Sequence, residues 1–267
     1  ELTKKILSGS YYFVFSFNYF PIVAMACKAC RLPYVSWTYD SPFIQLYSKT
    51  LEYDTNFAFV FDKGICLDLE KKGLRTYYLP MAAPIGCNGE QWEKKEDYMC
   101  DVSFVGSLYS EIHNDMYRHM EMLGAYEKGF LDALVQAQKN VYGFHFLEEV
   151  LKERPNLVKK IQEVCPIYAR GDGLDSVEWT LAYYFLSRRV TAIERTEILQ
   201  LLGKRYGEEY KIHLYTPKNT AIQGILNKGK ADYYTQAPRI FADSKINLNI
   251  SLRSILTGIP LRAFDIM

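Results

Sequence analysis

Two charged residues near the end of the chain have the spacing of a small-molecule site. Arg262 and Asp265 stand three positions apart in a segment of helical period, so they share one side of that helix. A cation can hold a pyrophosphate and a carboxylate can hold ribose hydroxyls, which are two polar parts of a nucleotide. The spacing by itself favours the alternative, an ordinary ion pair on an exposed helix face.

The residues before this pair predict a strand, a turn and the start of a helix. Polar and apolar residues alternate from Lys245 to Ile250, which is typical of a strand. Gly258 allows an unusual turn, and Pro260 suits the first helical position, where the missing N–H would lack a partner anyway. Because a helix N-terminus presents unpaired N–H groups and a positive dipole, this segment is expected to hold a phosphate.

Segments of strand and helix alternate along the rest of the chain. Strands are expected at residues 11–18, 34–39, 56–62, 75–81, 102–105 and 210–215, and the longest helical region at 112–207. In that region Asp175 and Glu178 have the spacing of a capping box. The alternation predicts parallel α/β sheets, in which ligands bind at the carboxyl ends of the strands. Asp40 and Asp62 occupy such ends, and for Asp62 capping of the next helix is the favoured interpretation.

Composition excludes several classes of protein. The chain has 267 residues, 49% of them hydrophobic, and a net charge of +1, which gives no field to attract nucleic acid. The sequence shows no apolar run long enough to span a membrane and no signal peptide. Its six cysteines are scattered, as in a reduced cytoplasmic protein, and neither they nor its four histidines predict a metal site. The chain also starts without methionine and stops inside a helical pattern, so we expect it to be clipped at both ends.

Three motifs carry a resemblance to a known family. They are VSWTYDSP at residues 35–42, DVSFVGSLY at 101–109, and SKINLNISLRSILTGIPLRAFDI at 244–266. In this order they resemble the bacterial spore-maturation (CgeB-like) glycosyltransferases of the GT-B superfamily. The resemblance implies two Rossmann-like domains: an incomplete acceptor-side domain at 1–90, a linker at 91–100, and a nucleotide-sugar domain at 101–267 that contains the helical stretch. With about four strands, the first sheet should expose an apolar edge around residues 11–17.

The resemblance also implies a site. Donor-binding residues would come from the second domain: Gly106, Ser107, Asn249, Ser251, Gly258, Arg262 and Asp265. Asp40 would act as the general base, and the aromatic side chains of Trp37 and Tyr39 would contact the acceptor. No metal and no cofactor beyond the nucleotide-sugar donor is implied. In the wider superfamily a carboxylate pair eight residues apart contacts the donor, but the first of these positions is Thr257 here.

These observations leave three functions open. The first is transfer of a sugar from a nucleotide-sugar to a glycan or protein acceptor, in cell-envelope, spore-coat or protein glycosylation. The second is a non-catalytic protein of the same shape that binds a glycan or a partner, which Thr257 favours. The third is a sugar-nucleotide epimerase, which would need no separate acceptor.

Overall fold

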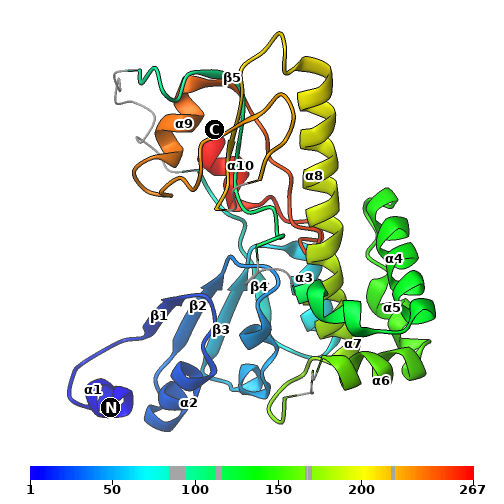
Figure 1. The fold of residues 1–267 in the computed structure, drawn as a ribbon. Helices are drawn as coiled ribbons and strands as arrows, with labels where there is room; N and C mark the ends of the chain where they lie inside the picture. Colours follow the sequence, from blue (N-terminus) through cyan, green and yellow to red (C-terminus); the bar gives the residue numbers. More distant parts are fainter. Residues whose placement is uncertain (84–93, 112–115, 166, 168–169, 218–219) are drawn as a thin grey trace.

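The computed structural model describes residues 1–83, 94–111, 116–165, 167, 170–217 and 220–267, and these form an α/β fold. Two four-stranded parallel sheets form separate lobes, with the long helix α8 running beside both (Figure 1). The prediction of an α/β protein with parallel sheets is thus confirmed. Residues 84–93, which include part of the expected linker, lie outside the described residues.

The first sheet has the strand order β1-β2-β3-β4. Its strands are β1 (Val14–Phe17), β2 (Tyr34–Thr38), β3 (Asn56–Val60) and β4 (Thr76–Tyr78). Its helices and 3₁₀ turns are α1 (Leu2–Leu7), α2 (Pro21–Cys30), η1 (Ile44–Tyr47), η2 (Lys49–Glu52) and α3 (Lys63–Lys71). Pro21 begins α2, and Gly73, with φ +80°, follows the end of α3.

Helices cover one face of this sheet. The four strands follow one another across the sheet, so right-handed connections bring each linking segment to the same face. On that face Tyr34, Ser36 and Thr38 of β2 are buried, while Val35 and Trp37 on the other face stay partly exposed. Along β1 the aromatic side chains are about half exposed. The expected apolar edge at residues 11–17 is therefore present.

The second sheet has the strand order β7-β6-β5-β8. Its elements are β5 (Cys100–Val105), β6 (Ile212–Tyr215), β7 (Leu226–Asn227), α9 (Ala237–Asp243), β8 (Ser244–Asn247) and α10 (Leu261–Ile266). β5 pairs with β8 in parallel, with Val102 opposite Ile246. Because these strands are parallel neighbours, they deliver their carboxyl ends to one edge of the sheet, as the sequence predicts.

A helical part lies between β5 and β6 in the sequence. It consists of η3 (Met116–Met122), α4 (Ala125–Asn140), α5 (Leu147–Lys152), α6 (Pro155–Val164), α7 (Val177–Thr180), the π-helix η4 (Leu181–Leu186) and α8 (Ser187–Tyr206). The predicted capping box is wrong. Ser176 caps α7 by accepting a hydrogen bond from Trp179 N at 3.0 Å, while Asp175 pairs with Arg170.

The helical part packs on the first lobe although its sequence lies within the second. Trp179 is buried in the core of the first sheet, where its ring lies 4.2 Å from that of Tyr47. The backbone of Gly173 also bridges to Ser48. The lobes therefore share helices α7 to α8 as a common support. Within the described residues, no helix combines the length and apolar character needed to cross a membrane.

Candidate functional site

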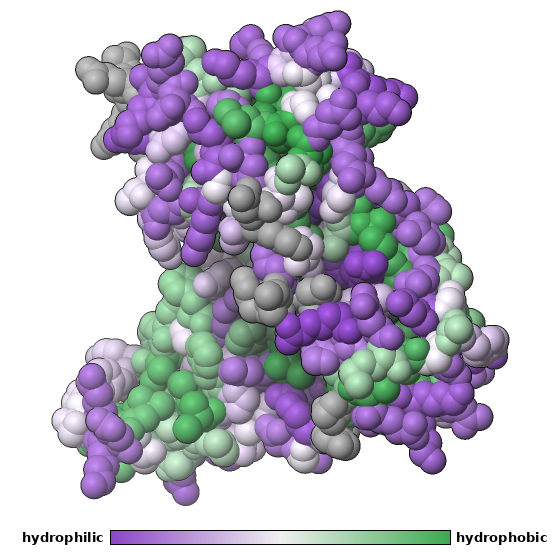
Figure 2. Space-filling model, in the orientation of Figure 1, coloured by the Kyte–Doolittle hydropathy of each residue, from purple (hydrophilic) through white to green (hydrophobic). Residues whose placement is uncertain are grey.

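The carboxyl ends of the two sheets meet where the molecule is hollowed between its lobes (Figure 2). The hydroxyl of Tyr184, in η4, donates to the carbonyl of Pro42 just after β2, at 2.9 Å. Burial raises the pKa of Tyr39, and nearby Asp40 and Tyr234 add to the effect. Since Tyr39 follows β2 and Tyr234 belongs to the second lobe, the two lobes approach each other here. We call this region the cleft.

Asp40 is held at the end of β2 by an amide from the neighbouring strand. Asn18, directly after β1, donates from Nδ2 to Oδ2 of Asp40 at 2.7 Å. Its Oδ1 accepts from the backbone N of Tyr39 at 3.2 Å. Asn18 is buried and adopts φ +60°, a conformation that asparagine tolerates better than most residues. Asp40 itself is exposed, so its carboxylate is fixed in direction yet open to solvent.

The two side chains predicted to contact the acceptor substrate, Trp37 and Tyr39, lie in different parts of the first lobe. Trp37 lies on the face of the first sheet that no described helix covers, beside Phe17, and its Nε1 donates to the carbonyl of Leu79 at 3.1 Å. Tyr39 lies beyond the strand end, adjacent to Asp40 and half-buried. Of the pair, Tyr39 is the one that borders the cleft.

The turn after β5 is stabilised from within by a buried carboxylate. Ser107 donates from its hydroxyl to Glu111 at 2.6 Å and accepts from the backbone N of Tyr109 at 2.8 Å. Glu111 also accepts from the backbone N of Leu108 at 3.0 Å. Tyr109 takes φ +55°, which is unusual for an aromatic residue. The predicted Gly106–Ser107 turn therefore exists, and the hydroxyl of Ser107 shapes it.

Arg195 of α8 ties this turn to the segment after β8. It donates from Nη1 to the carbonyl of Ser107 at 2.5 Å, and from Nε and Nη2 to the carbonyl of Ile250 at 3.0 and 2.5 Å. Burial lowers the pKa of Arg195, and the charge of Arg262 acts in the same direction. Arg195 thus joins the two strand-end loops and brings a positive charge beneath them.

Arg188 lies one heptad before Arg195 and reaches both lobes. Its guanidinium is 5.9 Å from the ring of Tyr109 and 5.5 Å from the ring of Tyr184. Its Nε atom is buried, with no hydrogen-bond partner in the described parts of the chain. None of the ion pairs found among the described residues includes Arg188. Among the residues that the structure describes, Arg188 therefore brings to the cleft a positive charge without a carboxylate in ion-pair contact.

Arg262 and Asp265 lie on α10 as a half-buried pair. Arg262 Nη1 is 3.8 Å from Asp265 Oδ2, and their side chains are 26% and 17% exposed. The hydroxyl of Tyr233 donates to Asp265 at 2.9 Å, and the guanidinium lies 5.2 Å from the ring of Phe241. Burial, together with the bond to Asp265, raises the pKa of Tyr233 to about 12, so the phenol stays protonated as this donor. The ion pair is therefore partly shielded from solvent, and both charges lie near the carboxyl end of β8.

The segment between β8 and α10 is longer than the sequence predicts. β8 ends at Asn247, and α10 begins at Leu261, so Pro260 is the N-cap and not the first helical residue. Asn249 is exposed and Ser251 half-buried in this segment. A Cβ on Gly258 would lie 2.6 Å from the Phe61 ring, so the absence of a side chain lets the segment approach the first lobe.

Asp62 anchors this segment to the first lobe. It caps α3 by accepting from Gly64 N at 2.9 Å and Ile65 N at 3.4 Å, which confirms the favoured interpretation of this carboxylate. It also accepts from Leu256 N at 2.6 Å and from the hydroxyl of Thr257 at 3.0 Å. Because Asp62 is fully buried, it belongs to the junction between the lobes and is not open to a ligand.

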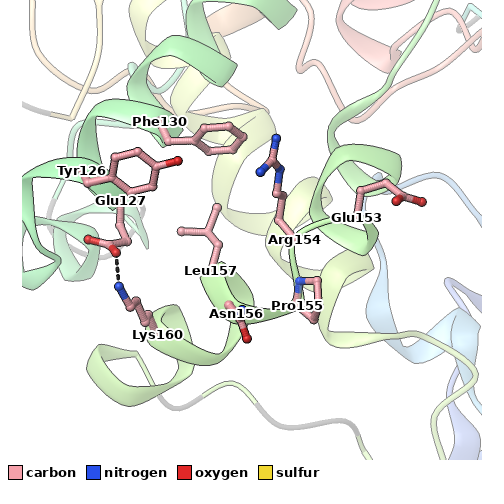
Figure 3. Close-up of a pocket in the computed structure, with 9 residues that line it drawn as sticks. All are labelled: Tyr126, Glu127, Phe130, Glu153, Arg154, Pro155, Asn156, Leu157 and Lys160. Atoms are coloured by element: carbon pink, nitrogen blue, oxygen red, sulfur yellow. Dashed lines mark hydrogen bonds and ion pairs between the residues drawn. The ribbon is translucent and has the colours of Figure 1, made fainter.

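Two of the hollows lined by described residues outside the cleft have volumes comparable to a small-molecule site. One, of about 250 Å³, lies between α4 and the turn from α5 to α6 (Figure 3). In this hollow Lys160 forms an ion pair with Glu127, and the guanidinium of Arg154 packs 5.4 Å from the ring of Phe130. Both positive charges are therefore already in contact with a carboxylate or an aromatic ring. The other, of about 300 Å³, is bordered by Arg253, which pairs with Glu194. No residue of the predicted site lines either hollow.

Among the described residues, no three histidine, cysteine, aspartate or glutamate side chains gather as metal ligands. No family model matches the chain, and no curated protein or solved structure matches it. The residue-level geometry of the cleft is therefore the basis for any functional proposal.

Sequence reasoning missed three residues of the cleft: Asn18, Arg188 and Arg195. A signal existed for the arginines, because positions seven apart lie on one face of a helix and both fall within the long helical region. No signal identified Asn18, whose partner Asp40 is 22 positions away and comes near only through the pairing of β1 with β2.

Proposed function

We propose that this chain is the core of a glycosyltransferase that takes a nucleotide-sugar as donor. The observation that carries the proposal is the pairing of unlike groups across one cleft. Arg188, which forms no ion pair with a described carboxylate, lies near the β5 edge, and an oriented, exposed carboxylate, Asp40, lies at the β2 edge. An anionic leaving group and a hydroxyl nucleophile would need groups of these two kinds.

The positive side of the cleft suits a diphosphate. Arg188, Arg195 and Arg262 surround the carboxyl edges of β5 and β8. Arg195 uses its donors on backbone carbonyls, so it contributes charge, and Arg188 adds a second charge beside Tyr109. Charge that develops on a departing diphosphate would be stabilised by such preorganised cations. Asp265 and the exposed Asn249 would contact the sugar or ribose hydroxyls.

On the opposite side Asp40 would serve as the base. The acceptor hydroxyl oxygen would attack the anomeric carbon of the donor, and the bond from that carbon to the diphosphate oxygen would break. The bonding electrons would leave with the diphosphate, and the hydroxyl proton would pass to Asp40. Tyr39, beside Asp40, would contact the acceptor, and no step requires a metal ion.

A non-catalytic role is the second candidate, because of Thr257. In the superfamily that the chain resembles, a carboxylate at this position contacts the donor. Here the position is Thr257, whose hydroxyl donates to Asp62 at 3.0 Å. A protein that binds a nucleotide or glycan without turning it over would tolerate this change. In the first candidate Asp265 would contact the donor without a second carboxylate eight residues before it.

Ligand-dependent thermal unfolding tests the proposal, followed by an assay for sugar transfer. A panel of nucleoside diphosphates is added to the chain, and at a hundred times its dissociation constant the correct one should stabilise the fold by about 2.7 kcal/mol. The matching nucleotide-sugar, offered with glycan and protein acceptors, should then yield glycosylated product. Stabilisation with neither product nor donor hydrolysis would favour the non-catalytic candidate. No stabilisation by any nucleoside diphosphate would refute nucleotide binding and the proposal with it.

A further inference from the structure

The edge of the first sheet at β1 is short, but it lacks the charged residues and prolines that commonly keep a strand from pairing with another chain. The residues from Tyr11 to Phe20 include no charged residue and no proline. Natural edge strands are protected by such residues, by bulges or by covering segments. β1 pairs with β2 on one side, and no described strand pairs with its other side.

The outward backbone groups of β1 belong to its phenylalanines. Val14 N donates to the carbonyl of Pro33 at 2.9 Å, and Asn18 N donates to that of Trp37 at 2.8 Å, so these residues face the sheet. Since the direction alternates along a strand, the N–H and C=O groups of Phe15 and Phe17 point away from the sheet. They are available for a ladder with a further strand.

Apolar side chains flank this free edge on both faces of the sheet. On the uncovered face lie Phe13, Phe15 and Phe17, with 55%, 48% and 57% of their surface exposed, and Ile22 and Met25 of α2 are exposed on the other side. At ~200 Å² for a fully exposed large side chain, these residues and the 91% exposed Tyr12 present about 700 Å². Two copies would thus offer up to ~1,400 Å² in total, which lies within the ~1,200–2,000 Å² that specific interfaces bury.

We propose that β1 is a homodimer interface, at which two copies of this chain pair their β1 strands antiparallel about a two-fold axis. The same edge then serves both partners, as a two-fold interface requires. Pairing joins the two sheets into one of eight strands and satisfies the backbone of Phe15 and Phe17. It also brings the α2 helices together on one face and the phenylalanines together on the other. A net charge of +1 offers little repulsion to the association.

Sedimentation velocity of the full chain over a wide concentration range tests this proposal. Phe15→Lys puts like charges beside each other across the axis and should raise the dimer dissociation constant by more than about tenfold. Phe15→Pro removes an outward N–H without removing a bond to β2, and should also favour the monomer. Tyr77→Lys is the matched control, because Tyr77 lies on β4 at the far side of the same face.

The control variant should dimerise like the wild type, and circular dichroism should show that all three variants keep their secondary structure. A wild-type chain that stays monomeric at all concentrations would overturn the proposal. So would a dimer that Tyr77→Lys dissociates and Phe15→Lys does not, because packing of the uncovered faces would then hold it together.

Discussion

Asp62 and Thr257 stand 195 positions apart, yet hydrogen bonds between the buried Asp62 and the exposed Thr257 join the two lobes. The carboxylate caps α3 and also accepts from the backbone and hydroxyl of Thr257. The same hydroxyl accepts from Gly64 N at 2.8 Å. One residue of the first lobe therefore fixes both the start of its own helix and the position of the segment that leads to Arg262.

Removal of the Asp62 carboxylate should destabilise the whole chain. Asp62→Ala leaves buried N–H groups of α3 and of the 256–257 segment without acceptors, so we expect a loss of about 3 kcal/mol in the free energy of unfolding. Thr257→Val removes a hydroxyl only and should cost about 1 kcal/mol. Denaturant unfolding measures both.

An exposed carboxylate provides the control for this pair. Asp54 pairs with Lys28, and its side chain is 77% exposed, so Asp54→Asn should leave the free energy of unfolding almost unchanged. If Asp62→Ala cost no more than Asp54→Asn, the junction would not contribute to the stability of the fold.

The sequence predicted the location of strands and helices better than their exact ends and caps. Period-2 and helical patterns located the strands and helices to within a few residues, because burial of one face imposes those periods. Strand ends were set too late, as at β8, because alternation continues into residues that have no ladder partner. The capping box failed because Asp175 pairs with Arg170, five residues earlier, and Ser176 caps the helix instead.

The sequence predicted several residues of the candidate site but not the hydrogen bonds that hold them in place. Alternation of strands and helices correctly placed Asp40 and the Gly106 turn at strand ends. The support of Asp40 by Asn18, and of Ser107 by Arg195, depends on which strands and helices become neighbours. Such long-range contacts leave no periodic trace, and they were visible only in the fold.

His145 should make the chain sensitive to acid. Burial lowers the pKa of His145 from an ordinary 6.5 to about 4, and its Nε2 lies 2.8 Å from the hydroxyl of Ser187. Below pH 6.5 the unfolded chain binds a proton that the folded chain resists. Stability is therefore complete above about pH 6.5 and falls as the pH drops toward 4, by about 3 kcal/mol in total.

Unfolding titrations at several pH values should separate this effect from other groups. His145→Phe keeps a ring against Tyr183, which stacks 4.3 Å away, and leaves Ser187 bonded to the carbonyl of Ala182. The difference in unfolding free energy between wild type and variant should be constant above pH 6.5 and shift in favour of the variant below it. A difference that does not vary with pH would contradict the assignment to His145.

Arg188 and Arg262 should each contribute to nucleotide affinity. Arg262→Ala should weaken binding of the nucleoside diphosphate by about 1.5–3 kcal/mol, the range for a hydrogen bond to a charged group, and Arg188→Ala should have a similar effect. Asp265→Asn should cost less, because an amide oxygen still accepts from a ribose hydroxyl. Calorimetric titration measures the three affinities.

Arg189 is the matched control for Arg188. It is adjacent on α8, but its guanidinium lies 4.9 Å from the ring of Tyr117 in the helical part and not in the cleft. Arg189→Ala should leave the affinity of the folded protein unchanged. If wild type, Arg188→Ala and Arg262→Ala bound the nucleoside diphosphate with equal affinity, neither arginine would bind the nucleotide. The Arg262–Asp265 pair would then be only a structural ion pair.

The last prediction separates the chemistry of Asp40 from its orientation by Asn18. Asp40→Asn keeps the size of the side chain but removes the base, so kcat for sugar transfer should fall by about 10²- to 10⁴-fold with KM little changed. Asn18→Gly keeps the permitted φ +60° and leaves the carboxylate in place without its 2.7 Å donor. This variant should therefore lose part of kcat, about tenfold, because the base remains but is no longer directed. Wild-type turnover in Asp40→Asn would exclude Asp40 from the reaction. A loss in Asn18→Gly that appears equally in the Asp40→Asn background would show that Asn18 acts through the fold and not through this carboxylate.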